Sequence, residues 1–101
     1  MGLLDFLTGN TTHQIQEYLQ KNAVILDVRT DSEYQSNHIA SALHIPLNEL
    51  EYRVDEVKVL KKPVIAYCAS GMRSGKAASF LKSNGIDAIN GGGIGKLKAA
   101  L

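Results

Sequence analysis

The stretch from residue 63 to residue 85 joins an apolar run, a loop of small residues and a helical pattern. Pro63 opens the run Val64 to Tyr67, whose short, continuous apolar character is typical of a strand buried on both faces. Apolar positions then recur at helical spacing from about Ser74 to Asn84, and Gly85 follows where a left-handed C-terminal cap belongs. A strand that leads through a tight loop into a helix predicts a βαβ unit and therefore a parallel sheet.

The rest of the chain alternates between helical and strand-like patterns in the same way. Thr11 with Gln14 and Thr30 with Glu33 match the capping box, and Asn48 is a candidate helix N-cap. We therefore predict an α/β fold with a mainly parallel, four- to five-stranded sheet and helices on both faces. In chain order the predicted elements are a helix to about residue 20, a strand over 23–28, a helix over 30–36, a strand over 39–45, a helix from 48, the strand over 64–67, the helix over 74–84, a strand over 86–89, a glycine-rich turn over 91–93 and a closing segment over 94–101.

Size and charge narrow the class of protein. A chain of 101 residues, 45% of them apolar, is expected to form a single domain over residues 1–101. The net charge of +1 comes from mixed basic and acidic residues, which predicts no nucleic-acid partner and no membrane partner. No apolar run approaches membrane-spanning length, and the first ten residues lack the features of a signal peptide. We expect a cytoplasmic location.

The only cysteine, Cys68, lies between the predicted buried strand and the helix that follows. A lone cysteine excludes an internal disulfide but leaves an inert buried residue, a reactive thiol or an intermolecular link. Backbone N–H groups at a helix N-terminus, together with a nearby cation such as Arg73, lower the pKa of a thiol. Gly71 permits a tight turn there. This surrounding sequence favours an acidic, accessible nucleophile over an inert strand end.

Two separated segments give the sequence a specific resemblance to the rhodanese family. The loop Cys68-x-x-Gly71-x-Arg73-Ser74 resembles the active-site loop of that family. The likeness covers the chain from about residue 22 to residue 93, with departures at Asn37, Ser41, Ile94 and Leu97. The second segment is similar to the upstream signature of the family and comprises Leu26-Asp27-Val28-Arg29, Glu33-Tyr34, His38-Ile39, Ala42 and Ile45-Pro46.

The resemblance implies a single-domain, rhodanese-like sulfurtransferase of the thiosulfate sulfurtransferase type. Cys68 is then the catalytic nucleophile, which takes the outer sulfur of a small donor, thiosulfate or a persulfide, and holds it as a persulfide. A thiol acceptor, with a thioredoxin-like protein as one candidate, would remove that sulfur. The resemblance implies no metal and no organic cofactor. The implied binding loop comprises Ala69, Ser70, Gly71, Met72, Arg73 and Ser74, with Arg73 neutralising the charge of the donor.

Four residues outside the loop are predicted to support it without taking part in a catalytic step. Asp27, Arg29 and Glu33 fall at a strand end and the start of the next helix, where we expect one charged network. His38 is the candidate for a hydrogen bond that fixes the loop before Ala42.

Other functions share parts of this pattern. Cysteine-dependent phosphatases and arsenate reductase-like enzymes use Cys-x5-Arg, whereas four residues separate Cys68 and Arg73 here, and that shorter ring suits a sulfur atom better than a tetrahedral oxyanion. A phosphate-binding P-loop fails because Ser70 and Ala77 replace its first glycine and its hydroxyl residue. A non-catalytic interaction module of the same fold is the remaining alternative. Because Cys68, Gly71 and Arg73 are all present, the enzyme is favoured.

Overall fold

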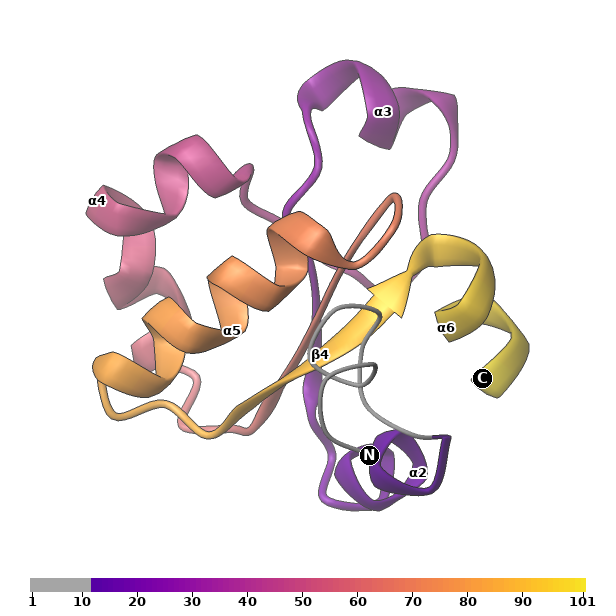
Figure 1. The fold of residues 1–101 in the computed structure, drawn as a ribbon. Helices are drawn as coiled ribbons and strands as arrows, with labels where there is room; N and C mark the ends of the chain where they lie inside the picture. The colour runs from indigo at the N-terminus through magenta and orange to yellow at the C-terminus, as the bar shows by residue number, and fades with distance from the viewer. Residues whose placement is uncertain (1–11) are drawn as a thin grey trace.

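The computed structural model describes residues 12–101, in which helices and strands alternate along the chain (Figure 1). The predicted capping box at Thr11 lies outside the described residues, although the first helix ends at Gln20 as predicted. In chain order the elements are α2 (Thr12–Gln20), β1 (Val24–Asp27), α3 (Asp31–Ser36), β2 (Leu43–His44), α4 (Leu47–Lys58), β3 (Val64–Cys68), α5 (Met72–Ser83), β4 (Ala88–Gly93) and α6 (Ile94–Ala100).

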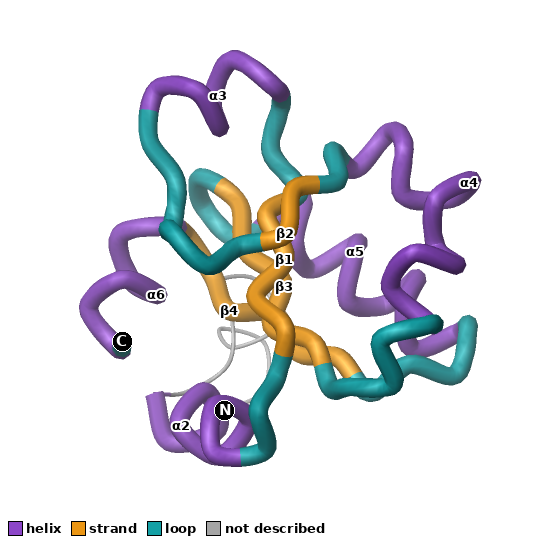
Figure 2. Tube along the Cα trace, turned by 180° about the vertical axis from the view of Figure 1, so that it is seen from behind, coloured by secondary structure: helices purple, strands orange, loops and turns teal. Residues whose placement is uncertain are grey.

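The four strands form one parallel sheet in the order β2-β1-β3-β4, which confirms the predicted fold class. Helices α4 and α5 cover one face of the sheet, and α2 and α6 cover the other (Figures 1 and 2). Parallel pairing places the carboxyl ends of the strands at one edge, where α/β sheets bind ligands. Asp27 of β1 lies opposite Tyr67 of β3 at that edge, and Cys68 lies opposite Gly93 of β4.

Strand β3 is the centre of two hydrophobic cores, because its side chains alternate between the faces of the sheet. Val64, Ala66 and Cys68 join the core under α4 and α5, whereas Ile65 and Tyr67 join the core under α2 and α6. All five residues are buried, as the continuous apolar run predicted. Cys68 is thereby fixed at the end of a strand that has packed side chains on both faces.

Helix α5 begins two residues earlier than predicted, at Met72 instead of Ser74. Gly71 is its N-cap and has a φ of 102°, a left-handed conformation that favours glycine. At the other end Gly85 has a φ of 80°, which confirms the predicted cap. The N–H of Gly85 donates to the carbonyl of Lys82 and the N–H of Ile86 to that of Leu81, as in a Schellman motif.

Strand β4 lies later in the chain than predicted, at Ala88–Gly93 instead of residues 86–89. The glycine run predicted to form a turn is part of this strand. The Schellman motif uses the N–H of Ile86, so pairing with β3 starts only at Ala88. The glycines permit a close approach between the strands. A Cβ on Gly91 would lie 2.7 Å from Cγ2 of Ile65, and one on Gly93 would lie 2.5 Å from the carbonyl oxygen of Ala69.

Two other predicted boundaries were wrong. The strand predicted over residues 39–45 shrinks to Leu43–His44, because the N–H of Ile39 donates to the hydroxyl of Tyr67 and that of Ala42 turns back to the carbonyl of Ile39. Asn48 is not an N-cap, since α4 already begins at Leu47 behind Pro46. The N–H of Leu47 donates to the carbonyl of Val28 and so ties the helix start to the end of β1.

Helix α3 has no buried residue and is held by polar and ring contacts. The predicted capping box between Thr30 and Glu33 is present. The ring of Tyr34 stacks between those of His38 and His44, with ring centroids 3.8 Å and 4.3 Å apart. Nδ1 of His38 also forms a hydrogen bond of 2.9 Å with the carbonyl of Tyr34, which fixes the chain where it leaves α3.

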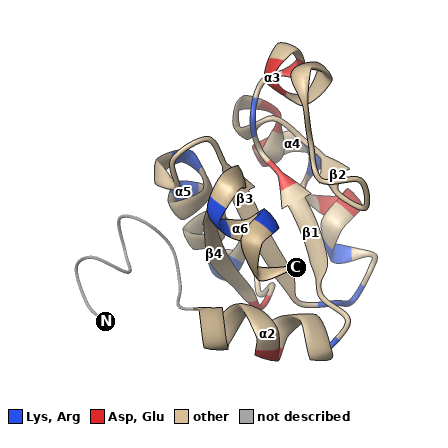
Figure 3. Ribbon diagram, turned by 90° about the vertical axis from the view of Figure 1, so that its right-hand side faces the viewer, with Lys and Arg blue, Asp and Glu red and all other residues tan. Residues whose placement is uncertain are grey.

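Acidic and basic residues are intermixed over the ribbon, and the carboxyl end of β1 is acidic (Figure 3). Within residues 12–101, no helix has both the length and the apolar character needed to span a bilayer.

Candidate active site

Several hydrogen-bond donors converge on the sulfur of Cys68 from the loop and first turn that follow it. The N–H of Gly71 lies 3.0 Å from Sγ, and the N–H and the hydroxyl of Ser74 each lie 3.4 Å away. The left-handed conformation of Gly71 turns the chain so that the first turn of α5 faces back toward the strand end. The arrangement is a nest of N–H groups at a helix N-terminus, which favours an anion at Sγ.

The pKa of Cys68 reflects two opposing effects. Burial raises the pKa of this thiol, whereas hydrogen bonds from the hydroxyl of Ser74 and from the backbone of Ser74, Gly71 and Ser70 lower it and prevail. The predicted acidity of the thiol agrees with this direction. The predicted accessibility does not, because Cys68 is 0% exposed in this structure. The next two residues of the loop, Ala69 and Ser70, are exposed.

We expect alkylation of Cys68 by iodoacetamide to follow the thiolate, with a pH half-point below that of a free thiol, which is about 8.5. Because the sulfur is buried, the limiting rate at high pH should be lower than that of an unstructured cysteine peptide. Rates measured by intact mass between pH 5 and 10 test both statements. A half-point at or above the free-thiol value would show that burial prevails over the hydrogen bonds.

Arg73 forms a bidentate ion pair with Glu33 of α3, a partner that the loop motif did not predict. Nη1 and Nη2 of Arg73 lie 2.7 Å and 2.9 Å from the two carboxylate oxygens. This geometry is the strong, planar form of an arginine–carboxylate pair. The pair joins the first turn of α5 to α3, which lies 40 residues earlier in the chain. Arg73 therefore anchors the loop in addition to placing a positive charge near Cys68.

The ion pair between Glu33 and Arg73 should make part of the free energy of unfolding depend on pH. The hydrogen bond from Arg73 is the main cause that lowers the pKa of Glu33 from 4.5 to about 2. Because the pKa of Glu33 is lower in the folded state, the pair stabilises the protein fully at a pH above the ordinary pKa of 4.5. That contribution is lost as the pH falls toward 2. Glu33→Gln should therefore lower Tm near pH 6, with a difference that shrinks by pH 3. Because both side chains are about a third exposed, the effect at pH 6 should be modest. A difference independent of pH would contradict this account.

A second polar network lies at the end of β1, where Asp27 pairs with Arg29, while Glu33, the third residue of the predicted charged network, forms its hydrogen-bonded ion pair with Arg73. Arg29 donates to Asp27 through Nε and Nη2, at 3.1 Å and 2.9 Å to the nearer oxygens, and both side chains are buried. The hydroxyl of Tyr67 donates to Asp27 as well, at 2.7 Å, and accepts the N–H of Ile39. Burial raises the pKa of Asp27, but the hydrogen bonds from Arg29 and Tyr67 lower it by more, so the pKa lies below its ordinary value. This network fixes the segment after β1 on the carboxyl edge of the sheet.

Asn90 of β4 is a site residue that the sequence analysis missed. Its Nδ2 donates to the carbonyl of Gly71 at 2.9 Å, and its Oδ1 accepts the hydroxyl of Ser74 at 2.6 Å. The sequence held one signal, an asparagine between an apolar pair and a glycine run, because a polar residue at a buried strand position needs a partner.

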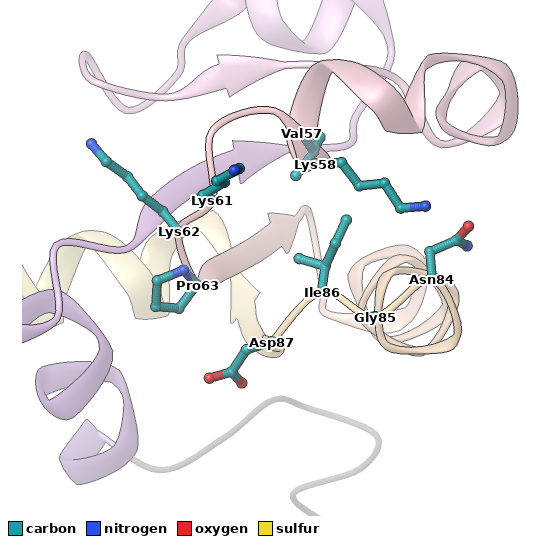
Figure 4. A pocket seen from close by; sticks show the side chains of 9 residues that line it. All are labelled: Val57, Lys58, Lys61, Lys62, Pro63, Asn84, Gly85, Ile86 and Asp87. Atoms are coloured by element: carbon teal, nitrogen blue, oxygen red, sulfur yellow. The ribbon is translucent and has the colours of Figure 1, made fainter.

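A cavity of about 410 Å³ lies away from Cys68 and its loop (Figure 4). It is bordered by Pro63, just before β3, and by Asp87, just before β4, so it lies at the amino ends of these strands, whereas Cys68 is at the carboxyl end of β3. Figure 4 shows the side chains of Lys58, Lys61 and Lys62 spread apart around it. Across the described part of the chain, no three metal-ligating side chains gather into a cluster.

Comparison with known proteins agrees with this geometry. The sequence profile described as Rhodanese-like domain matches residues 11–99. The chain belongs to the rhodanese-like domain family. Among curated relatives, this rhodanese-like chain is 40% identical to the uncharacterized protein YqhL of Bacillus subtilis over 78% of its own length and 67% of the relative's. It is 34% identical to the thiosulfate sulfurtransferase GlpE of Coxiella burnetii, over 69% of this chain and 64% of GlpE.

The solved structures show the same rhodanese-like fold within proteins of different length. The reduced CoADR-RHD protein of Bacillus anthracis matches with a TM-score of 0.74 and 32% identity, over 94% of this chain and only 17% of that protein. The chain therefore spans a small part of some relatives and about two thirds of others.

Proposed function

We propose that this chain is a sulfurtransferase that carries a sulfane sulfur as a persulfide on Cys68. The observation that supports this most is the convergence of the N–H groups of Gly71 and Ser74 and the hydroxyl of Ser74 on one buried sulfur. These groups favour the thiolate, and they would equally stabilise the negative charge of a persulfide. The relative named thiosulfate sulfurtransferase supports the same reaction class.

The proposed reaction has two nucleophilic steps. The thiolate of Cys68 attacks the outer sulfur of thiosulfate, so an S–S bond forms at Sγ while the S–S bond of the donor breaks and its electron pair leaves with sulfite. A thiophile then attacks the outer sulfur of the persulfide, and the electron pair of that S–S bond returns to Sγ. A persulfide donor and a thiol acceptor, including a thiol on a thioredoxin-like protein, would use the same two steps. Neither step uses a metal or an organic cofactor.

The other site residues have defined parts in this proposal. Ala69, Ser70 and Met72 form the exposed rim that a donor must pass, because Cys68 itself is buried. Arg73 supplies positive charge near the sulfur and holds the loop against Glu33 of α3. The supporting residues of the network at the end of β1 and the ring stack are Asp27, Arg29 and His38.

The test is to load the protein with thiosulfate, remove the excess, and measure intact mass. We expect a gain of one sulfur atom, which cyanide removes as thiocyanate, and no gain in protein first alkylated at Cys68. Hydrolysis of p-nitrophenyl phosphate should not occur. A chain that gains no sulfur and forms no thiocyanate would be a non-catalytic module, and phosphatase activity that requires Cys68 without sulfur transfer would identify a cysteine-dependent phosphatase or an arsenate reductase-like enzyme.

A further inference from the structure

One side chain contacts two of the three residues that present N–H groups to Cys68, Gly71 and Ser74. Asn90 lies on β4, is 6% exposed, and is paired in register with Ala66 of β3. Its Nδ2 donates to the carbonyl of Gly71 and its Oδ1 accepts the hydroxyl of Ser74. The amide of Asn90 thereby links strand β4 to the loop and to the first turn of α5.

The orientation of this amide is fixed by its partners. The N–H of Gly92 donates to Oδ1 at 2.9 Å, and an N–H requires an acceptor, which only the amide oxygen provides. The carbonyl of Gly71 requires a donor, which only the amide nitrogen provides. These requirements select the same orientation, so Nδ2 faces Gly71 and Oδ1 faces Ser74.

We propose that Asn90 is a positioning residue of the sulfur site, which holds Gly71 and Ser74 where their N–H groups converge on Cys68. Its role in catalysis rests on the proposed function, whereas its effect on the thiol does not. The two N–H groups lie 3.0 Å and 3.4 Å from Sγ, and hydrogen bonds weaken steeply as distance and angle depart from these values. Release of the loop from Asn90 therefore weakens the stabilisation of the sulfur anion.

Ser74 links Asn90 to the sulfur directly. Its Oγ lies 2.6 Å from Oδ1 of Asn90 and 3.4 Å from Sγ of Cys68. The hydroxyl has a single hydrogen, for which Oδ1 and Sγ compete, and Oδ1 is the nearer acceptor. The effects of Asn90 and Ser74 on the thiol should therefore be coupled instead of additive.

The variant that tests this is Asn90→Leu, which keeps a similar shape and removes both polar atoms. The charged groups around the thiol are Arg73 of α5, with Glu33 of α3 and Asp27 of β1 beside it, and a neutral substitution leaves their number unchanged. We expect the alkylation half-point of Cys68 to rise by about one pH unit. The kcat/KM for transfer from thiosulfate to cyanide should fall, by up to about a hundredfold.

The matched control is Asn84→Leu. Nδ2 of Asn84 also donates to a backbone carbonyl, that of Phe80 at 3.0 Å, but at the far end of α5. This variant should lose some stability and keep the wild-type alkylation half-point. In a Ser74→Ala background, Asn90→Leu should raise the half-point by less than it does alone. If the Leu variant does not fold, Asn90→Thr suits the strand, is too short to reach both partners, and should raise the half-point in the same direction.

Three outcomes separate this proposal from the proposed function. Folded Asn90 variants with a wild-type half-point and transfer rate would overturn the positioning role alone. A half-point that falls would overturn it too, because Asn90 would then merely withhold the hydroxyl of Ser74 from the thiolate. If the wild-type chain transfers no sulfur while Asn90→Leu still raises the half-point, the proposed function fails and the positioning of the thiol stands, because alkylation requires no sulfur donor.

Discussion

Replacing Cys68 with serine is expected to abolish sulfur transfer to the level of the uncatalysed background. The hydroxyl of a serine cannot form a persulfide, so neither step has a carrier. The loss should exceed about a thousandfold, as it does when a nucleophile is removed from a covalent mechanism. Thiocyanate formation from thiosulfate and cyanide measures the rate, and intact mass shows whether sulfur is bound.

The fold should survive this change. The serine oxygen occupies the position of Sγ, where the N–H of Gly71 and the hydroxyl of Ser74 are available to it. Circular dichroism and Tm should therefore remain close to wild type. Ser83→Ala is the control at an exposed position at the far end of α5, and it should retain transfer because Ser83 lies outside the loop. Turnover that persists in Cys68→Ser would exclude a persulfide on this residue.

Gly93→Ala, a substitution in β4, is expected to displace the backbone of the loop that follows Cys68. A Cβ at this position would lie 2.5 Å from the carbonyl oxygen of Ala69 and 3.4 Å from Cα of Ser70, both backbone atoms of the loop. The backbone angles of Gly93 are ones that alanine adopts, so the effect is steric. We expect a loss of about 1 to 3 kcal/mol in the free energy of unfolding. Sulfur transfer should fall as well, because the displaced peptide adjoins Cys68.

Gly95→Ala is the control for this substitution, since it adds the same methyl group two residues later. A Cβ on Gly95 meets no atom within 4 Å, and the residue lies in α6. Alanine there should raise the free energy of unfolding by up to about 1 kcal/mol through helix propensity and leave transfer unchanged. Chemical denaturation and the thiocyanate assay on both variants test the pair. Equal behaviour of the two variants would show that the close contact at Gly93 is relieved without cost.

The sequence predicted those features whose cause is local. The apolar run of β3 and the left-handed cap at Gly85 depend on neighbouring residues, and both were found as predicted. The position of β4 was missed because it depends on contacts between strands. Its glycines are needed where β3 and the loop approach closely, which a pattern of turn residues does not reveal.

The residues of the site were likewise predicted where their signal is local and missed where it depends on contacts between distant segments. The motif identified Cys68 and the loop that surrounds it. It did not reveal that Arg73 pairs with Glu33, because that pair joins residues 40 positions apart. The motif did not reveal Asn90 for the same reason, since Gly71 and Ser74 come within hydrogen-bond distance of Asn90 only when β4 pairs with β3.

The weak burial of α3 has a consequence for motion at the carboxyl edge of the sheet. Protein segments open locally with free energies that follow how much apolar surface they bury. Helix α3 buries no residue and depends on its capping box, the ring stack and the pair with Arg73. Strand β3, in contrast, is buried throughout. Opening of α3 is thus far less costly than opening of β3, and it releases one anchor of the loop while Cys68 stays fixed in the strand. The α3 side of the carboxyl edge, next to the proposed sulfur site, should therefore open more readily than the strand that bears Cys68.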